Sequence, residues 1–174
     1  MTYIEKALRT ESIEGAENRL QNVFTQLGSL NEALEYLVEK KADDIKKYIY
    51  YGKKANHVDI YEGKISDSLH HDVTDTQLRL LHSGLGMLTE AQEFLKPILD
   101  GILTDKDIDL VNLKEELGDM MWYAAIACDS LDTTFEEEQD RNIAKLTLRY
   151  PEKFTEDKAI NRDTDAERKV LEND

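Results

Sequence analysis

Two long stretches of this chain repeat apolar residues at steps of three and four, which is the spacing of one face of an α-helix. One stripe comprises Leu78, Leu81, Leu85, Leu88 and Leu95, and the other comprises Leu113, Leu117, Met121, Ala124 and Cys128. The 174 residues include two prolines and eight glycines, so few positions interrupt a helix. The sequence therefore predicts an all-α fold in which both stripes face the core.

Capping residues and glycines indicate where the helices begin and end. The capping-box pairs are Ser29 with Glu32, Thr74 with Gln77, and Thr133 with Glu136. The first three expected helices cover residues 1–10, 12–27 (ending at Gly28) and 30–51 (ending at Gly52). A fourth begins at residue 75 and is ended or kinked by Pro97 and Gly101. A fifth begins between Thr104 and Asp109 and ends at residue 130, and a sixth covers residues 135–150. Residues 52–74 form the one plausible internal break. We expect a single domain over 1–174, divided into N-terminal helices with a variable segment (1–75), a helical core (76–154) and a charged tail (155–174).

Two pairs of acidic residues lie beside the apolar stripes. Glu90 with Glu93, and Glu116 with Asp119, are each spaced i, i+3, so their like charges repel on one helix face by a few tenths of a kcal/mol. Repelling acids in apolar helices call for a cation. Carboxylates without Cys or His favour a hard divalent ion such as Mg²⁺ or Mn²⁺. Such an ion holds phosphate groups and activates water, so the pattern indicates metal-assisted attack on phosphate.

Two other interpretations of the acidic pairs stay open at this point. With 37 acidic residues in 174, chance alone gives roughly eight acid-x-x-acid pairs, so the pairs are also compatible with a non-catalytic acidic helical interaction or regulatory module. That alternative predicts no metal dependence. A di-iron carboxylate bundle is disfavoured, because it needs two Glu-x-x-His motifs and the chain has none; His82 does not repair the pattern.

The charge of the chain limits its partners. A formal net charge of −15 disfavours binding to nucleic acid or to an anionic membrane, since both rely on Lys and Arg. A bound metal ion reconciles this acidity with a phosphate substrate. The N-terminal residues lack an apolar signal segment, no apolar run reaches the 18 residues of a membrane span, and the single Cys128 has no internal disulfide partner. We expect a cytoplasmic protein.

Three polar residues recur along the helix expected at 135–150, at steps of three and four: Asn142, Lys145 and Arg149. The two cations either neutralise outer phosphates or are ordinary surface charges near a helix end. Tyr123, one turn beyond Asp119, either borders a nucleobase or fills the core. The histidines in the internal break match no metal-site spacing; they are His57, His70 and His71.

Three segments of the chain closely resemble the MazG-like nucleotide pyrophosphohydrolases of the all-α NTP pyrophosphatase superfamily. They are RLLHSGLGMLTEAQEFL, NLKEELGDMMWYAAIACDSL and RNIAKLTLRYPEKF, within residues 78–154. That family is marked by a Glu-x-x-Glu and a Glu-x-x-Asp that bind Mg²⁺, here Glu90, Glu93, Glu116 and Asp119. The resemblance implies a MazG-like helical bundle, with 76–154 as its catalytic core, that hydrolyses nucleoside triphosphates between the α and β phosphates. The products are a nucleoside monophosphate and pyrophosphate.

The same resemblance carries expectations about substrate contacts and assembly. Asn142, Lys145 and Arg149 match an Asn-x-x-Lys-Leu-x-x-Arg segment that contacts phosphates in the family. Family members are dimers or dimers of dimers, so we expect a homodimer or homotetramer. The short form resembles phage and bacterial members. Gln92 stands where relatives commonly have Gly, and the choice among aberrant nucleotides, dNTPs and signalling nucleotides such as guanosine tetraphosphate stays open.

Overall fold

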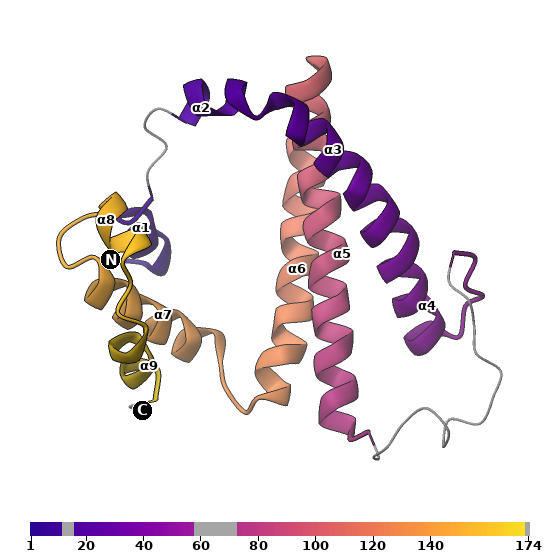
Figure 1. The fold of residues 1–174 in the computed structure, drawn as a ribbon. Helices are drawn as coiled ribbons and strands as arrows, with labels where there is room; N and C mark the ends of the chain where they lie inside the picture. Colours follow the sequence, from indigo (N-terminus) through magenta and orange to yellow (C-terminus); the bar gives the residue numbers. More distant parts are fainter. Residues whose placement is uncertain (12–15, 58–72, 173–174) are drawn as a thin grey trace. The chain divides into compact units, whose positions relative to one another are not determined.

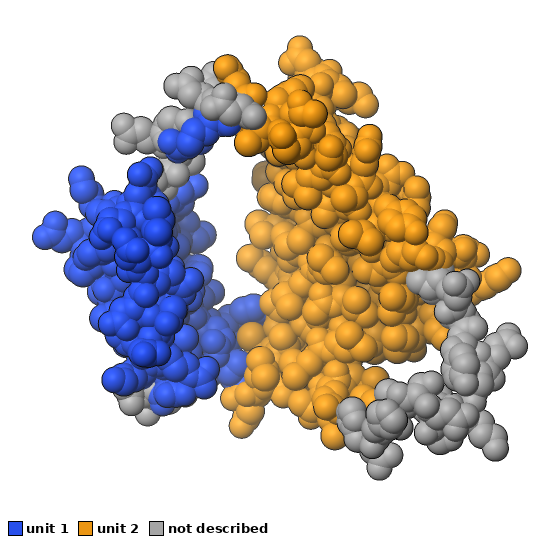
Figure 2. All heavy atoms as spheres, viewed as in Figure 1, with its two compact units in different colours: residues 1–19, 133–174 blue, residues 20–132 orange. Residues whose placement is uncertain are grey.

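The protein is described by a computed structural model that covers residues 1–11, 16–57 and 73–172. Within these ranges every regular element is a helix and no strand occurs, which confirms the all-α prediction. The chain divides into two compact units (Figure 2). Unit 1 comprises residues 1–19 and 133–174, and unit 2 comprises residues 20–132. None of the described helices has both the length and the apolar content of a membrane span.

Two long helices form the centre of unit 2. Helix α5 (Asp75–Thr104) and helix α6 (Leu110–Ser130) run side by side (Figure 1). Thr74 caps α5 in a capping box with Gln77, as predicted, and Asp109 caps α6 through the backbone N–H groups of Val111 and Asn112. The start and end predicted for the second long helix are therefore confirmed.

Three consecutive helical segments pack along α5. They are α3 (Phe24–Leu34), the π-helical η1 (Glu35–Ala42) and α4 (Asp43–Tyr51), and they follow one another without a break. Helix α2 (Ala16–Asn22) precedes them. Gly52 ends α4 in the left-handed conformation (φ 62°), where its N–H donates to the carbonyl of Lys47, as the sequence predicts.

Two predicted helix boundaries in unit 2 are wrong. Helix α3 runs through Gly28 and Ser29, so neither the stop at Gly28 nor the Ser29 capping box exists. A glycine inside a helix costs only about 1 kcal/mol, which packing readily offsets. Helix α5 likewise continues past Pro97 to Thr104 and ends at Asp105 (φ 56°). Gly101 does not end the helix; a Cβ there would lie 3.0 Å from the Lys106 carbonyl, so the glycine makes room for the following turn.

Helices α5 and α6 approach each other closely at two small residues of α5. The Ser83 hydroxyl donates to the Tyr123 carbonyl at 2.8 Å, and a Cβ added at Gly86 would overlap the ring of Tyr123. Leu88 is 45% exposed and Met121 is 56% exposed. The prediction that both stripes face the core of the chain is therefore wrong for these positions. The close contact that Ser83 and Gly86 permit turns the large apolar residues outward.

Unit 1 contains the remaining helices. They are α1 (Tyr3–Leu8), α7 (Phe135–Arg149), α8 (Glu156–Ile160) and α9 (Thr164–Glu172). Helix α7 begins at Phe135 as predicted, but its capping box joins Thr134 with Glu137 and not Thr133 with Glu136. The hydroxyl of Thr133 instead donates to Glu138 at 2.8 Å. The extent predicted for a single domain over 1–174 stays a prediction.

Candidate metal centre

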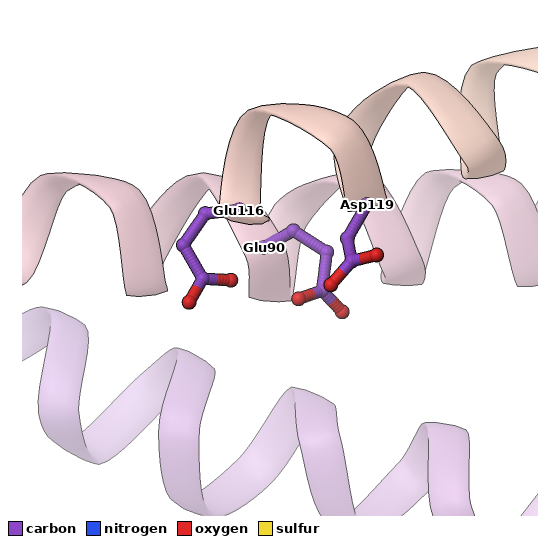
Figure 3. A group of neighbouring side chains, drawn as sticks. All are labelled: Glu90, Glu116 and Asp119. Carbon is purple, nitrogen blue, oxygen red and sulfur yellow. The ribbon is translucent and has the colours of Figure 1, made fainter. Parts of the chain in front are cut away.

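Helices α5 and α6 bring together three of the four acids that the sequence singles out. Glu90 comes from α5, and Glu116 and Asp119 come from one turn of α6. Each offers a carboxylate oxygen, and these oxygens all lie within 4.8 Å of one another (Figure 3). We call these three residues the acidic cluster. Its oxygen-only donor set and short spacing fit a hard divalent cation such as Mg²⁺ or Mn²⁺.

Two of the three acids of the acidic cluster are buried. Glu90 and Glu116 are buried, 8% and 6% exposed, whereas Asp119 is exposed. Burial, followed by the charges of Glu90, Glu115 and Asp119, raises the pKa of Glu116. The three carboxylates therefore repel one another, and a cation bound between them would reduce this repulsion.

Glu93, the fourth predicted acid, lies one turn beyond Glu90 and does not belong to the group of three. Its side chain is exposed and borders a groove of about 500 Å³, together with Glu116, Asn112, Lys47 and Asp43. Partial burial of its carboxyl group, followed by the charges of Glu90 and Glu116, raises the pKa of Glu93. The groove therefore joins Glu93 to the acidic cluster through Glu116.

A buried lysine that the sequence analysis did not single out contacts the acidic cluster. Lys46 of α4 is 5% exposed, and its Nζ donates to Thr89 Oγ1 at 2.7 Å and to Glu90 Oε1 at 3.3 Å. A signal for it exists in the sequence. Val38, Ala42 and Lys46 recur at steps of four on one helix face, and a lysine that continues an apolar stripe is unusual.

Tyr123 lies in the core beside the acidic cluster. It is 6% exposed, its ring packs against Gly86, and its hydroxyl lies 3.4 Å from that of Tyr51. Burial and then the hydrogen bond with Tyr51 raise the pKa of Tyr123, so it stays a neutral phenol. The observed contacts are those of the core alternative, and a contact of Tyr123 with a nucleobase stays a prediction.

The three polar residues predicted to contact phosphates belong to unit 1. The Tyr3 hydroxyl donates to Asn142 Oδ1 at 3.5 Å, and Lys145 borders a groove of about 340 Å³ beside Asn142. Arg149 is engaged within its own unit: its Nε donates to Glu167 Oε1 at 2.7 Å and its Nη2 donates to Glu167 Oε2 at 2.5 Å. A phosphate contact by any of the three stays a prediction.

The structure describes one histidine of the predicted internal break, His57, and it is not part of the acidic cluster. The ring of His57 lies 3.1 Å from Asp44 Oδ2, and the backbone N–H of Asn56 also donates to that oxygen at 2.7 Å. These bonds lower the pKa of Asp44, with the His57 backbone N–H as the largest cause. His70 and His71 lie outside the described residues, as does most of the break.

The Glu167 ion pairs give unit 1 a specific pH dependence. Arg149, and then Arg162, lower the pKa of Glu167 from 4.5 to about 2. A lowered folded-state pKa means that the stabilisation is present above about pH 4.5 and is lost as pH falls toward 2. Glu167→Gln should lower the free energy of unfolding by on the order of 2 kcal/mol at pH 7, measured in urea, and by less at pH 3. Glu172→Gln, which removes an exposed partner of Arg168, is the control; equal losses in the two variants would contradict the prediction.

The fold and the acidic cluster together define an all-α protein with a carboxylate site suited to a divalent cation. Residues 81–154 match the MazG nucleotide pyrophosphohydrolase domain, a segment that contains all of the acidic cluster. The gene 37 protein of Mycobacterium phage L5 is 35% identical over 102 residues, which cover 53% of this chain and 88% of the phage protein. The comparison with solved structures found no match. The chain belongs to the MazG nucleotide pyrophosphohydrolase family, as the sequence resemblance predicts.

Proposed function

We propose that this chain is a Mg²⁺-dependent hydrolase that cleaves nucleoside triphosphates between the α and β phosphates, releasing a nucleoside monophosphate and pyrophosphate. The observation that carries the proposal is the acidic cluster, which lies within the segment that matches the family and has carboxylate oxygens within 4.8 Å of one another. Mn²⁺ has similar ligand preferences and should substitute for Mg²⁺.

We assign two roles in this reaction to residues of unit 2, which are metal binding and proton transfer. Glu90, Glu116 and Asp119 hold the metal, which when bound neutralises phosphate oxygens and lowers the pKa of water. Glu93 lies on the same helix one turn away, faces the groove, and is the acid placed to complete the ligand set or to accept the proton of the attacking water.

We also propose that Asn142, Lys145 and Arg149 contact the phosphates of the substrate. Asn142, Lys145 and Arg149 lie on α7 within the segment that matches the family. The cationic side chains of Lys145 and Arg149, four residues apart, are suited to the outer phosphates of a nucleotide, whose charge the acidic cluster alone would repel. The base and sugar of the substrate stay open, as does the choice between removal of aberrant nucleotides, control of a dNTP pool and breakdown of a signalling nucleotide.

The reaction is tested by measuring monophosphate and pyrophosphate release from NTPs, dNTPs and guanosine tetraphosphate, with Mg²⁺, with Mn²⁺ and with EDTA. We expect metal-dependent release from at least one nucleotide. Release that continues in EDTA would contradict the role of the acidic cluster. No release from any nucleotide by a folded protein would favour the non-catalytic interaction module.

We also propose that the chain assembles as a homodimer or homotetramer. Helix α6 exposes one apolar stripe, in which Leu110 is 65%, Leu117 is 45% and Met121 is 56% exposed. These residues recur at steps of seven and four, so they share a face. Removing such a face from water contributes roughly 25 cal/mol per Å², and a second copy of the same stripe is a complementary occupant.

The assembly proposal predicts the effect of one charge placed in the stripe. Met121→Glu should lower the molar mass measured by light scattering after size exclusion, because a buried unpaired charge at an interface costs several kcal/mol. Ile160→Glu on α8, where the native side chain is 78% exposed, makes the same change elsewhere and should leave the mass unchanged. A wild-type protein that is already monomeric, or an unchanged mass in Met121→Glu, would contradict the proposal.

A further inference from the structure

Lys46 places a positive charge against the acidic cluster before any metal binds. Besides Glu90, its Nζ lies 3.7 Å from Asp43 Oδ1 and 5.3 Å from the centre of the Tyr123 ring. The ammonium group is therefore surrounded by carboxylates, a hydroxyl and an aromatic face, and the side chain is buried. A buried charge is costly unless it is paired, so these contacts hold the lysine in place.

Thr89 fixes where this charge lies. Its side chain is 1% exposed, its hydroxyl accepts from Lys46 at 2.7 Å, and it donates to the Gly86 carbonyl at 2.9 Å. The hydroxyl also lies 3.2 Å from Glu90 Oε1, the same oxygen that Lys46 contacts. Lys46 thus donates both to Thr89 and to the Glu90 oxygen beside it.

We propose that Lys46 is the internal counter-ion of the metal centre: it competes with a divalent cation for Glu90 and so weakens the affinity of the acidic cluster for metal. The inference rests on the proposed function, because it requires that Glu90 bind the metal. A cation at the acidic cluster and an ammonium 3.3 Å from a Glu90 oxygen repel each other. Without the metal, Lys46 offsets part of the negative charge and stabilises the fold.

The counter-ion role predicts two effects of removing the lysine charge, one on stability without metal and one on metal affinity. A lysine that is only packed near the site would not produce both. Removing the charge of Lys46 should destabilise the metal-free protein, because the repulsion among Glu90, Glu116 and Asp119 is then uncompensated. The same change should tighten metal binding, because the competing cation is gone. A lysine that positions Glu90 as a ligand predicts the opposite sign for metal affinity.

The test compares Lys46→Met and Lys46→Gln with the wild-type protein. Metal affinity is measured by calorimetry with Mg²⁺ and by electron paramagnetic resonance with Mn²⁺, without nucleotide, and thermal unfolding is followed with and without metal. We expect both variants to bind Mn²⁺ about tenfold more tightly, to melt at a lower temperature without metal, and to gain more from saturating Mn²⁺. Gln is included because it keeps an N–H donor for Thr89 and Glu90 while it removes the charge.

Lys40→Met is the matched control, since Lys40 has the same charge and pairs with Glu35 on η1 away from the acidic cluster. It should bind metal like the wild-type protein. Equal or weaker binding in both Lys46 variants, with normal binding by the wild-type protein, would overturn the counter-ion role alone. Absence of metal binding by the wild-type protein would overturn the proposed function as well. A Lys46 variant that folds only when Mn²⁺ is present would support the proposal.

Discussion

Asp119→Asn is expected to abolish metal-dependent release of pyrophosphate, with a fall in kcat/KM of at least about a hundredfold. The substitution keeps the size of the side chain but removes the charge of one ligand from the acidic cluster. The metal-free fold should stay intact or become slightly more stable, because a repelling acid has been neutralised. Turnover and urea unfolding of the same preparation measure the two expectations.

Glu115→Gln is the control for the Asp119 variant. Glu115 lies on the same helix, is exposed, and is not part of the acidic cluster, although its charge is one cause of the raised pKa of Glu116. It should retain metal-dependent turnover. Full activity in Asp119→Asn would end the proposal that the acidic cluster is the catalytic centre, whereas equal losses in both variants would point to a general effect of charge.

Glu93→Gln extends the comparison to the acid outside the group of three. The proposed reaction requires Glu93 either as a metal ligand or as the proton acceptor, so the Glu93→Gln variant should also lose turnover. Metal affinity separates the two roles: weaker Mn²⁺ binding indicates a ligand, and unchanged binding indicates the proton acceptor. Full activity would remove Glu93 from the catalytic residues.

The acidic cluster could be predicted from the sequence because helical spacing fixes which side chains leave one face together. Glu116 and Asp119 lie one turn apart on α6, and the pairing of α5 with α6 brings Glu90 to them. Spacing along one helix does not say where a second helix crosses it. The crossing places Glu90 in the group and leaves Glu93 outside, a distinction that the identical i, i+3 spacing of both pairs does not contain.

The orientation of the apolar stripes could not be predicted for a similar reason. Periodicity identifies an apolar face, but it does not say whether the same chain or a second copy covers that face. Ser83 and Gly86 give α5 a second, smaller face that permits close approach, and that face meets Tyr123. The place of Lys46 in the stripe of Val38 and Ala42 marks it as unusual, but the spacing does not say which acid it contacts until its burial against Glu90 is known.

Gly86→Ala should be among the most destabilising single-methyl additions in unit 2. The new Cβ would overlap the buried ring of Tyr123, which already packs beside the rings of Trp122 and His82. Adding volume to a tightly packed core costs typically 1–3 kcal/mol, and we expect a loss of about 3 kcal/mol in the free energy of unfolding. Urea unfolding without metal measures it.

Gly84→Ala provides a matched comparison on the same helix. A Cβ at Gly84 meets no atom within 4 Å, so the substitution should raise the free energy of unfolding by up to about 1 kcal/mol through helix propensity. The two variants should also differ in metal binding. Gly86 lies one turn before Glu90, and Tyr123 lies one turn after Asp119, so separating α5 from α6 at this contact moves the acidic cluster apart. Weakened Mn²⁺ binding in Gly86→Ala, with normal binding in Gly84→Ala, would show that the Gly86–Tyr123 contact sets the spacing of the metal ligands. Equal stability of the two variants would contradict the prediction that the Gly86–Tyr123 contact is tightly packed.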